Sequence, residues 1–307
     1  MYSNEQRKTL PALFYRWFGE KYPFYVGASK KQLPPPKFPP NIQYLTKPSD
    51  KMAQLNIEEP QRSILCGTII ADGSLRIKPK YRNARIQNRH STRQFTWFFW
   101  KWLVALERFV TGLSAISFQN PDGYQRRTKA DTEEILGKLH LYTKAHPDLT
   151  KLHAILCINN KEFIDRSWLN HMSDYFLMCV WLDDGSLYHS YQGCICLDYS
   201  TKEEQQVFCD YLKDAWDIEA YVANSREVLS DGRERHRIFI ANQSSLLKIL
   251  RIVAPKVPVE EMIYKVLFVP RNNPELLQRW ASEIKELVQP EFRAYVENFY
   301  EEKLNGR

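Results

Sequence analysis

No apolar run in the sequence is long enough to span a bilayer, which takes about 20 residues. The best candidate, Thr96 to Leu106, is interrupted by Lys101, and the polar start from Tyr2 to Thr9 lacks the hydrophobic region of a signal peptide. The six cysteines form no C-x-x-C pair, which disfavours a zinc site, and a chain of this size does not need disulfides. We therefore expect a soluble, non-secreted protein with reduced thiols and no membrane partner.

Two catalytic signatures are also missing. The sequence has neither the G-x-x-x-x-G-K-[ST] phosphate loop nor the H-E-x-x-H metal-binding motif. Apolar side chains, in contrast, are abundant. With 44% hydrophobic and 13% aromatic residues, the 307-residue chain fits one large or two smaller globular domains and is not a disordered protein.

Acidic residues are absent from one long stretch. Between Ser74 and Arg93 there are seven basic residues and no acid, whereas the net charge of the whole chain is only +7. A stretch of this kind is either a solvated face or a surface that binds a polyanion.

A weak internal repeat organises the chain. Ser63 to Leu75 reads S-I-L-C-G-T-I-I-A-D-G-S-L, and Tyr175 to Leu187 reads Y-F-L-M-C-V-W-L-D-D-G-S-L. Both are helix-like apolar runs that end in the same tetrapeptide, with Asp72 and Asp184 lying 112 residues apart. The repeat predicts a protein of two similar halves.

Similar segments follow each copy of the motif. S-T-R-Q at Ser91–Gln94 and S-T-K-E at Ser200–Glu203 fit capping boxes that open helices over Phe95 to Val110 and Gln205 to Trp216. Polar and apolar residues alternate before and after each capped helix, and this period of two predicts half-exposed strands. Each half is therefore predicted to run helix, two strands, helix, two strands, helix. The fold class is α+β, with antiparallel sheets covered on one face by helices.

Four regions are expected along the chain. Residues 1–50 form an N-terminal extension, in which five prolines between Leu33 and Pro40 predict a stiff extended connector. Residues 51–155 and 156–270 form the two halves. Residues 271–307 form a C-terminal helical tail, broken at Pro290, with a packing role.

The two motif helices are predicted to pack against each other. Gly67 and Ala71 share one helix face, and small residues there let two backbones approach closely. Gly73 and Gly185 fit the position that ends a helix. If the halves pair about an approximate two-fold axis, this face is the seam between them.

Such a seam makes Asp72 and Asp184 neighbours. Two carboxylates at helix C-termini repel each other and the local dipole, and bound divalent cations relieve that repulsion. Paired metals can activate a water and stabilise a leaving oxygen in phosphodiester cleavage. Next to a basic open sheet, this arrangement predicts hydrolysis of nucleic acid, although a single Asp-Gly after a helix would mean little.

At these residues the sequence resembles the LAGLIDADG homing endonuclease family. The motifs stand here as L-C-G-T-I-I-A-D-G at Leu65–Gly73 and L-M-C-V-W-L-D-D-G at Leu177–Gly185. I-N-N-K at Ile158–Lys161 and E-M-I-Y-K at Glu261–Lys265 extend the resemblance, which covers about Leu55 to Phe268. The second motif is similar to the single-chain subgroup that contains the yeast mitochondrial large-rRNA intron endonuclease.

The resemblance implies a fold and a metal site. The family has two pseudo-symmetric αββαββα halves, with the motif helices at the seam and saddle-shaped sheets in the DNA major groove. Asp72 and Asp184 would bind the metals and position the water. Ala71 and Asp183, which precede them, complete the expected metal set, although Asp183 is also interpreted as a cap of the helix end.

Further expectations come from the same resemblance. Lys161 and Lys265 match lysines near the two active sites and would polarise the water network or the scissile phosphates, with a one-residue shift to Glu162 open for the first. The implied cofactor is Mg²⁺, for which Mn²⁺ substitutes, while Ca²⁺ binds without supporting cleavage. The implied activity is a double-strand break with 3′ overhangs, made by a monomer encoded in a mitochondrion or chloroplast, or in a bacterial or phage host.

The predicted DNA contacts are outward-facing side chains of the strands. Arginine suits guanine, and glutamine or asparagine suits adenine, while other contacts only touch phosphates. His90 and His236 are given no catalytic role. The predicted set comprises Arg76, Lys78, Lys80, Arg82, Arg85, Gln87, Arg89, His140, Tyr142, Lys144, Tyr188, His189, Tyr221, Arg233, Arg235 and Arg237.

Two other functions stay open at this point. The resemblance also permits a splicing cofactor, or maturase, that binds group I intron RNA with or without DNA cleavage. A basic DNA-binding protein without chemistry is the other alternative, and it would not need Asp72 and Asp184 as a pair.

Overall fold

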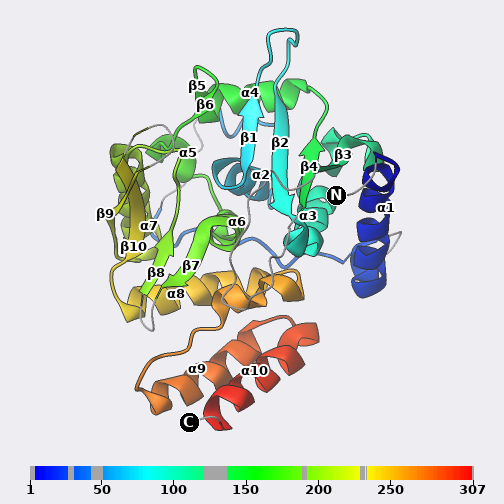
Figure 1. Cartoon of the computed structure of the whole chain (residues 1–307). Helices are drawn as coiled ribbons and strands as arrows, with labels where there is room; N and C mark the ends of the chain where they lie inside the picture. The colour runs from blue at the N-terminus through cyan, green and yellow to red at the C-terminus, as the bar shows by residue number, and fades with distance from the viewer. Residues whose placement is uncertain are drawn as a thin grey trace.

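The computed structural model describes residues 4–26, 31–42, 51–119, 137–188, 192–228, 232 and 234–305. In this part of the chain two four-stranded antiparallel sheets have equivalent strand orders, β1-β2-β4-β3 and β7-β8-β10-β9 (Figure 1). The predicted α+β class with antiparallel sheets is confirmed, and each half runs helix, two strands, helix, two strands, helix.

The bounds of these elements follow the chain. The first half consists of α2 (Gln61–Ile70), β1 (Gly73–Arg76), β2 (Arg85–Ser91), α3 (Phe95–Lys101), β3 (Ile116–Gln119), β4 (Lys138–Tyr142) and α4 (Pro147–Leu156). The second half consists of α6 (Asp174–Asp184), β7 (Gly185–Tyr188), β8 (Gln192–Ile195), α7 (Lys202–Trp216), β9 (Ala220–Val228), β10 (Glu234–Ile240) and α8 (Gln243–Val253). Between the halves lie a hairpin of β5 (Cys157–Ile158) and β6 (Lys161–Glu162) and the short helix α5 (Arg166–Leu169).

Strand β2 shows how the sheet is divided into two faces. Ile86, Asn88 and His90 are buried. At the alternate positions Arg85 is half-buried and Arg89 is exposed. Successive side chains of a strand point to opposite faces, so the even positions pack on the helices and the odd positions face outward.

The seam between the halves is formed by α2 and α6. A Cβ atom added to Gly67 would lie 2.6 Å from the Cβ of Cys179 and 2.9 Å from the carbonyl oxygen of Phe176. No larger residue fits there without moving one of the helices, so the glycine sets how closely the two backbones approach.

The glycines after the motif helices differ from expectation. Gly73 and Gly185 begin strands, and Gly185 has an ordinary extended backbone with φ −76° and ψ 149°. A Cβ at Gly73 would lie 2.6 Å from the carbonyl oxygen of Thr68, and one at Gly185 2.5 Å from that of Trp181. The glycines are therefore required by the sharp helix-to-strand turn, where a side chain would collide with the preceding helix.

Both predicted capping boxes also need correction. In the second half the box is one residue later, because the Thr201 hydroxyl accepts from the Glu204 N–H and the Glu204 carboxylate accepts from the Thr201 N–H. The Ser200 hydroxyl instead donates to the carbonyl of Leu197. In the first half Ser91 accepts only from Arg93 and caps a single 3-10 turn, and the helix that follows ends at Lys101 before a turn of π-helix.

The N-terminal extension packs on the body. It comprises α1 (Asn4–Lys21), a 3-10 turn (Pro23–Tyr25) and an extended segment over residues 31–42. Phe18, Tyr22 and Tyr25 are buried against the core. The extended segment is held by the hydroxyl of Tyr175, which donates to the carbonyl of Pro34 at 2.7 Å.

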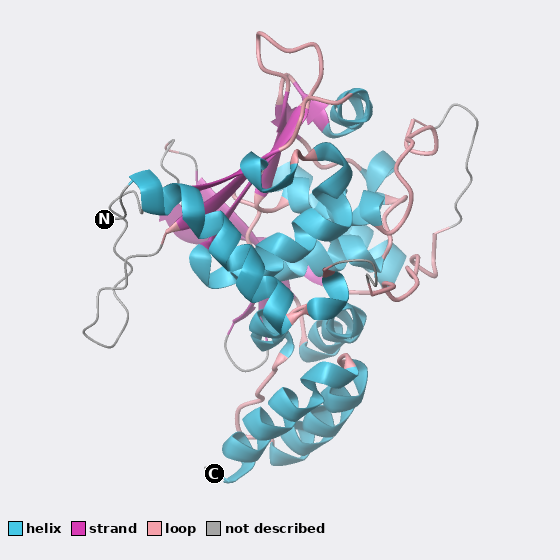
Figure 2. Cartoon of the chain, turned by 90° about the vertical axis from the view of Figure 1, so that its right-hand side faces the viewer, coloured by secondary structure: helices cyan, strands magenta, loops and turns pink. Residues whose placement is uncertain are grey.

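The C-terminal tail is a helical hairpin. Its helices, α9 (Pro274–Leu287) and α10 (Arg293–Asn305), are joined by a 3-10 turn that begins at Pro290, and they lie beyond α8 at one end of the molecule (Figures 1 and 2). Within the described residues, no helix combines the length and the apolar character needed to cross a bilayer.

Candidate active site and nucleic-acid surface

The two motif aspartates lie at the C-terminal ends of the seam helices. Asp184 is the last residue of α6, and Asp72 stands between α2 and β1. Burial, followed by the negative charge of Asp183, raises the pKa of the Asp72 carboxyl. Burial, followed by the charges of Asp72 and Asp183, raises the pKa of Asp184 well above its usual value. The fold thus brings the three carboxyls into one electrostatic neighbourhood.

The carboxylate of Asp183 accepts hydrogen bonds from side chains of the first half. The indole N–H of Trp97 donates to its Oδ1 at 2.6 Å, and the Lys101 ammonium lies 3.0 Å from Oδ1 and 2.8 Å from Oδ2. The side chains of both Lys101 and Asp183 are 0% exposed. Because a buried charge needs a partner, this ion pair compensates the charge of Asp183.

His90 lies beside the acids on the helix-facing side of β2. Its Nδ1 is 3.5 Å from Oδ2 of Asp72, and its Nε2 is 4.0 Å from Oδ1 of Asp183. Burial, followed by the positive charge of Lys101, lowers the pKa of His90. One ligand atom from each of Asp72, His90 and Asp183 can be chosen so that all three lie within 4.8 Å of one another.

The carboxylates of Asp72 and Asp184 are suitable ligands for a divalent cation. Crowded carboxylates whose pKa values are raised gain most from a bound cation, and Mg²⁺ takes one or two carboxylates together with phosphate oxygens. Asp183 fits less well than expected, because its oxygens already accept from Lys101 and Trp97. Ala71 has no side-chain ligand, so only its backbone could contribute.

The two predicted lysines have different positions. Lys265 is buried, and its ammonium donates to the carbonyl of Gly185 at 2.5 Å. Burial lowers its pKa, against the opposing charges of Asp183, Asp184 and Asp72. Lys161 is exposed on β6, and among the described contacts no hydrogen bond or ion pair joins it to either motif aspartate.

Glu162, the alternative at a one-residue shift, is a buried structural acid. Its Oε1 accepts from the N–H of Leu75 at 2.8 Å, and its Oε2 is 3.2 Å from the Arg76 guanidinium. The structure therefore places Lys265 at the acid cluster, while the first half offers no equivalent lysine from β6.

Comparison with known proteins agrees with this geometry. A model of the LAGLIDADG DNA endonuclease family matches residues 62–246. The chain belongs to the LAGLIDADG family.

Among solved structures, the homing endonuclease I-WcaI, bound to its DNA recognition sequence, is similar in fold. The TM-score is 0.54 at 17% sequence identity, over 71% of this chain and 90% of that chain. A search of curated proteins found no match. The predicted family is therefore confirmed, and the role of a DNA endonuclease is supported.

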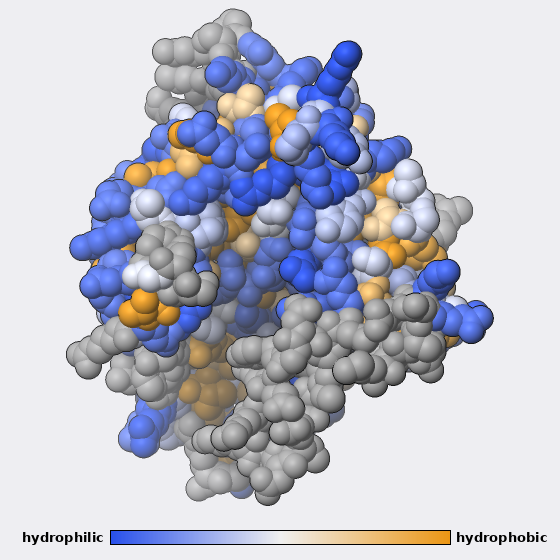
Figure 3. All heavy atoms as spheres, turned by 45° about the horizontal axis from the view of Figure 1, so that its top comes forward, coloured by the Kyte–Doolittle hydropathy of each residue, from blue (hydrophilic) through white to orange (hydrophobic). Residues whose placement is uncertain are grey.

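In this LAGLIDADG protein the predicted DNA contacts of the first half are divided between strands and loops. Lys78, Lys80 and Arg82, which were expected on a strand, lie in the loop between β1 and β2, whereas Arg85, Gln87 and Arg89 lie on β2. The Arg85 guanidinium stacks over the Tyr142 ring at 4.6 Å, and Lys78 lies 5.7 Å from the same ring. Arg89 donates to Gln119 at 2.6 Å. Lys80, Arg82 and Lys144 are exposed and Gln87 is half-buried, and Figure 3 shows a mostly hydrophilic face that is hollowed near its centre.

His140 does not belong to that accessible set. It is only 2% exposed, and it lies beneath Tyr142, with ring centroids 4.2 Å apart, and beside Gln119 at 3.1 Å. Burial, followed by the charges of Arg89, Arg85 and Lys78, lowers its pKa to about 4. The period-two pattern placed His140 outward correctly but could not show that larger neighbours cover it.

The second sheet carries paired arginines. Arg235 donates to Asp198 at 2.8 Å and also bonds Glu227, while Arg237 lies 3.1 Å from Glu227. Tyr221 is exposed and stacks on Phe239. His189, Arg233 and the side chain of Tyr188 lie outside the described residues.

Sequence reasoning missed Trp97, His90 and Lys101 as neighbours of the site. A usable signal existed for Lys101, which is the single charge inside the apolar run Thr96 to Leu106. Lysine is almost never fully buried unless it is paired, so this position predicts an acidic partner without identifying it.

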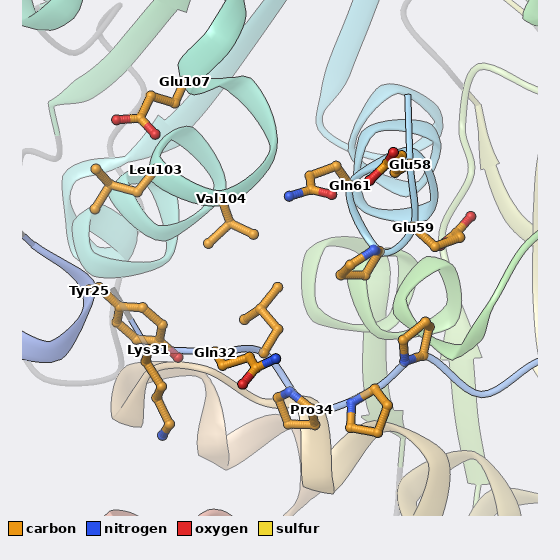
Figure 4. A pocket seen from close by; sticks show the side chains of 14 residues that line it. Tyr25, Lys31, Gln32, Pro34, Glu58, Glu59, Gln61, Leu103, Val104 and Glu107 are labelled. Carbon is orange, nitrogen blue, oxygen red and sulfur yellow. The ribbon is translucent and has the colours of Figure 1, made fainter. Parts of the chain in front are cut away.

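A separate cavity lies at the other end of α2. Its volume is about 880 Å³, and its lining includes Tyr25, Glu58, Glu59, Gln61 and Val104 (Figure 4). The carboxylate of Glu59 already accepts from neighbouring side chains on both of its oxygens. Because the cavity is at the N-terminal end of α2 and the motif aspartates are at the C-terminal ends of their helices, it is not part of the acid cluster.

Proposed function

We propose that the protein is a site-specific, Mg²⁺-dependent homing endonuclease that breaks both strands of a long asymmetric DNA target and leaves 3′ overhangs. The observation that carries this proposal is the crowding of Asp72 and Asp184, one from each half, beside the buried cation Lys265. A DNA-binding protein without chemistry has no use for this costly arrangement.

Each residue of the site has a distinct proposed role. Asp72 and Asp184 hold the divalent cations, which, when bound, activate a water and stabilise the leaving oxygen. Lys265, fixed by the Gly185 carbonyl, contributes positive charge where the phosphate develops negative charge. Asp183 remains with Lys101 and Trp97 and keeps the end of α6 in place.

DNA is bound by the outward faces of the two sheets. Arg85 and Arg89 of the first sheet and Lys78 of its β1–β2 loop form no ion pair among the described residues, and these groups neutralise phosphates or reach base edges in the major groove. The single chain already carries both halves, so we propose that it acts as a monomer. An organelle is the proposed location.

The proposal is tested by cleavage of a plasmid library that carries randomised inserts. Wild type in Mg²⁺ is expected to linearise a subset of the library and to leave 3′ overhangs, whereas in Ca²⁺ it should bind the selected site without cutting it. Asp72→Asn and Asp184→Asn should each abolish the double-strand break, while the exposed Asp214→Asn should not.

Two results would contradict the proposal. One is a wild-type protein that selects no cleaved sequence in Mg²⁺ or Mn²⁺, in which case binding to group I intron RNA becomes the hypothesis to pursue. The other is normal cutting of both strands by either motif variant.

A further inference from the structure

The two motif aspartates have different neighbours. The positive charge of Lys265 lowers the pKa of both Asp184 and Asp72, opposing the effect of burial. Among the described residues, however, only Asp72 lies beside an imidazole. The imidazole belongs to His90, which reaches the acids from β2 rather than from either motif helix.

The His90 ring is held firmly. Its side chain is 0% exposed, and it meets the Phe98 ring edge to face with centroids 6.0 Å apart. On one edge, Nδ1 lies 3.2 Å from Oε1 of Gln94 and 3.5 Å from Oδ2 of Asp72. A ring packed in this way has one orientation toward Asp72.

The neighbours of the ring indicate which of its two nitrogens carries the proton. A neutral imidazole has one N–H, and both the amide oxygen of Gln94 and the carboxylate of Asp72 accept hydrogen bonds. Nδ1 is therefore the donor. Nε2 has no hydrogen-bond partner among the described residues.

His90 is poorly placed to ligate a metal together with Asp183. The Lys101 ammonium, 2.8 Å from Oδ2 of Asp183, already neutralises that carboxylate. A divalent cation between Nε2 and Asp183 would be next to this positive charge, and the repulsion would be severe in a buried site.

We infer that His90 is a positioning residue of the first catalytic acid. Its Nδ1–H, which donates to Oε1 of Gln94 at 3.2 Å, also faces Oδ2 of Asp72 at 3.5 Å and orients that carboxylate for the cation. This inference rests on the proposed nuclease function and adds to it an asymmetry, since no described imidazole holds Asp184. Hydrogen-bond partners that orient metal ligands typically change metal affinity or activity by about 10–100-fold when they are removed.

Two substitutions separate positioning from packing. In His90→Asn the amide nitrogen falls near the place of Nδ1 and keeps a donor toward Asp72. In His90→Gln the amide nitrogen falls near Nε2, so the donor toward Asp72 is lost although the side-chain volume is closer to that of histidine. A purely structural role therefore predicts that His90→Asn is the worse variant, because it leaves the larger cavity.

The measurements are the binding of Mn²⁺ to the protein by electron paramagnetic resonance, the Mn²⁺ concentration that gives half-maximal cleavage, and the unfolding midpoint. We expect His90→Gln to raise the dissociation constant for Mn²⁺ and the Mn²⁺ concentration for half-maximal cleavage about 10–100-fold. For His90→Asn we expect both values to stay within a few fold of wild type. The unfolding midpoint serves as the check that both variants are folded at the assay temperature.

Equal losses in the two variants, or a larger loss in His90→Asn, would overturn the inference. A wild-type protein that binds Mn²⁺ but cleaves no DNA would overturn the proposed function instead. In that case the binding of Mn²⁺ by the two variants still decides the role of His90.

Discussion

The outer faces of the two sheets use arginine in different ways. In the first sheet Arg85 stacks on tyrosine rings and Arg89 bonds an amide, and neither forms an ion pair among the described residues. In the second sheet Arg235 and Arg237 share Glu227, and Arg235 also bonds Asp198. Sheets with equivalent strand orders therefore present unequal positive charge.

This difference changes what each arginine can do. A guanidinium stacked on an aromatic ring keeps its donors for phosphate or guanine. One that is already bound to carboxylates must give up those bonds before it contacts DNA. We infer that the first sheet contributes most of the electrostatic affinity, while the second sheet positions its arginines for fewer contacts.

The largest effect is expected at the charge that exists in one half only. Asp183 stands where the first half has Ala71, and its partner is Lys101. Lys101→Met should leave a buried carboxylate without its cation and lower the free energy of unfolding by about 3–5 kcal/mol, measured by urea titration.

The double variant Lys101→Met/Asp183→Ala makes the second motif like the first. It should recover most of that stability, because removing both charges also removes their desolvation cost. Lys285→Met, which breaks the exposed pair with Glu297, is the matched control and should cost about 1 kcal/mol or less. A double variant as unstable as Lys101→Met would show that the charge itself is not the cause.

The contact between the halves should also make stability depend on pH. Glu261, from the second half, accepts from the N–H of Trp97 at 2.5 Å, and burial raises its pKa to about 7. The folded protein therefore holds this proton more tightly than the unfolded chain. Its contribution is fully present below about pH 4.5 and is lost as the pH rises through 7, by about 3 kcal/mol in total.

Glu261→Gln should flatten this decline when unfolding is followed between pH 5 and 8. Glu260→Gln, at the exposed neighbour that pairs with Lys21, should keep the wild-type slope. If both variants retain the decline, Glu261 is not its source.

The comparison of the sheets predicts unequal reductions of DNA affinity. Arg85→Ala/Arg89→Ala should weaken binding to a mixed-sequence duplex by about tenfold and reduce the slope of log affinity against log salt by about 0.9 for each phosphate that is no longer neutralised. Arg235→Ala/Arg237→Ala should change both less, as measured by fluorescence anisotropy in Ca²⁺. Glu227→Gln should tighten binding, and equal reductions from both sheets would refute the comparison.

The smallest effect is expected at the capped helices. Thr201→Ala removes a full capping box from α7 and should lower stability by about 1 kcal/mol. Ser91→Ala removes one bond from a 3-10 turn and should cost less in the same thermal unfolding experiment. A larger cost for Ser91→Ala would mean that the first half depends on this turn more than its hydrogen bonds indicate.

The sequence alone predicted what depends on local pattern. Apolar runs, alternating segments and the repeated Asp-Gly endings predicted the order of elements in each half, because helix and strand periodicities are local. The motif also predicted that Asp72 and Asp184 are neighbours, since both lie at the same point of a duplicated unit, and the charge of Asp72 does act on Asp184. The close packing at Gly67 followed from the absence of a side chain.

The remaining features depend on partners far along the chain. Lys101 and Asp183 are 82 residues apart, and Arg235 and Asp198 are 37 apart, so no local pattern shows that these charges meet. His140 could be placed on a face but not under Tyr142. The N-cap is Thr201, one residue after the predicted Ser200. The hydroxyl of Ser200 is not available as a cap because it donates to the carbonyl of Leu197 in a buried hydrogen bond.

The proline-rich segment of residues 31–42 precedes the first half in the sequence but is bound to residues of the second half. The Lys37 N–H donates to Asp174, which in turn pairs with Lys256, and Lys256 also donates to Pro35. All of these anchors belong to the second half, although the segment precedes the first. A chimaera that exchanges one half for that of a relative would lose these matched contacts. Recombination should therefore transfer residues 31–42 together with α6 and the 3-10 turn Ala254–Lys256.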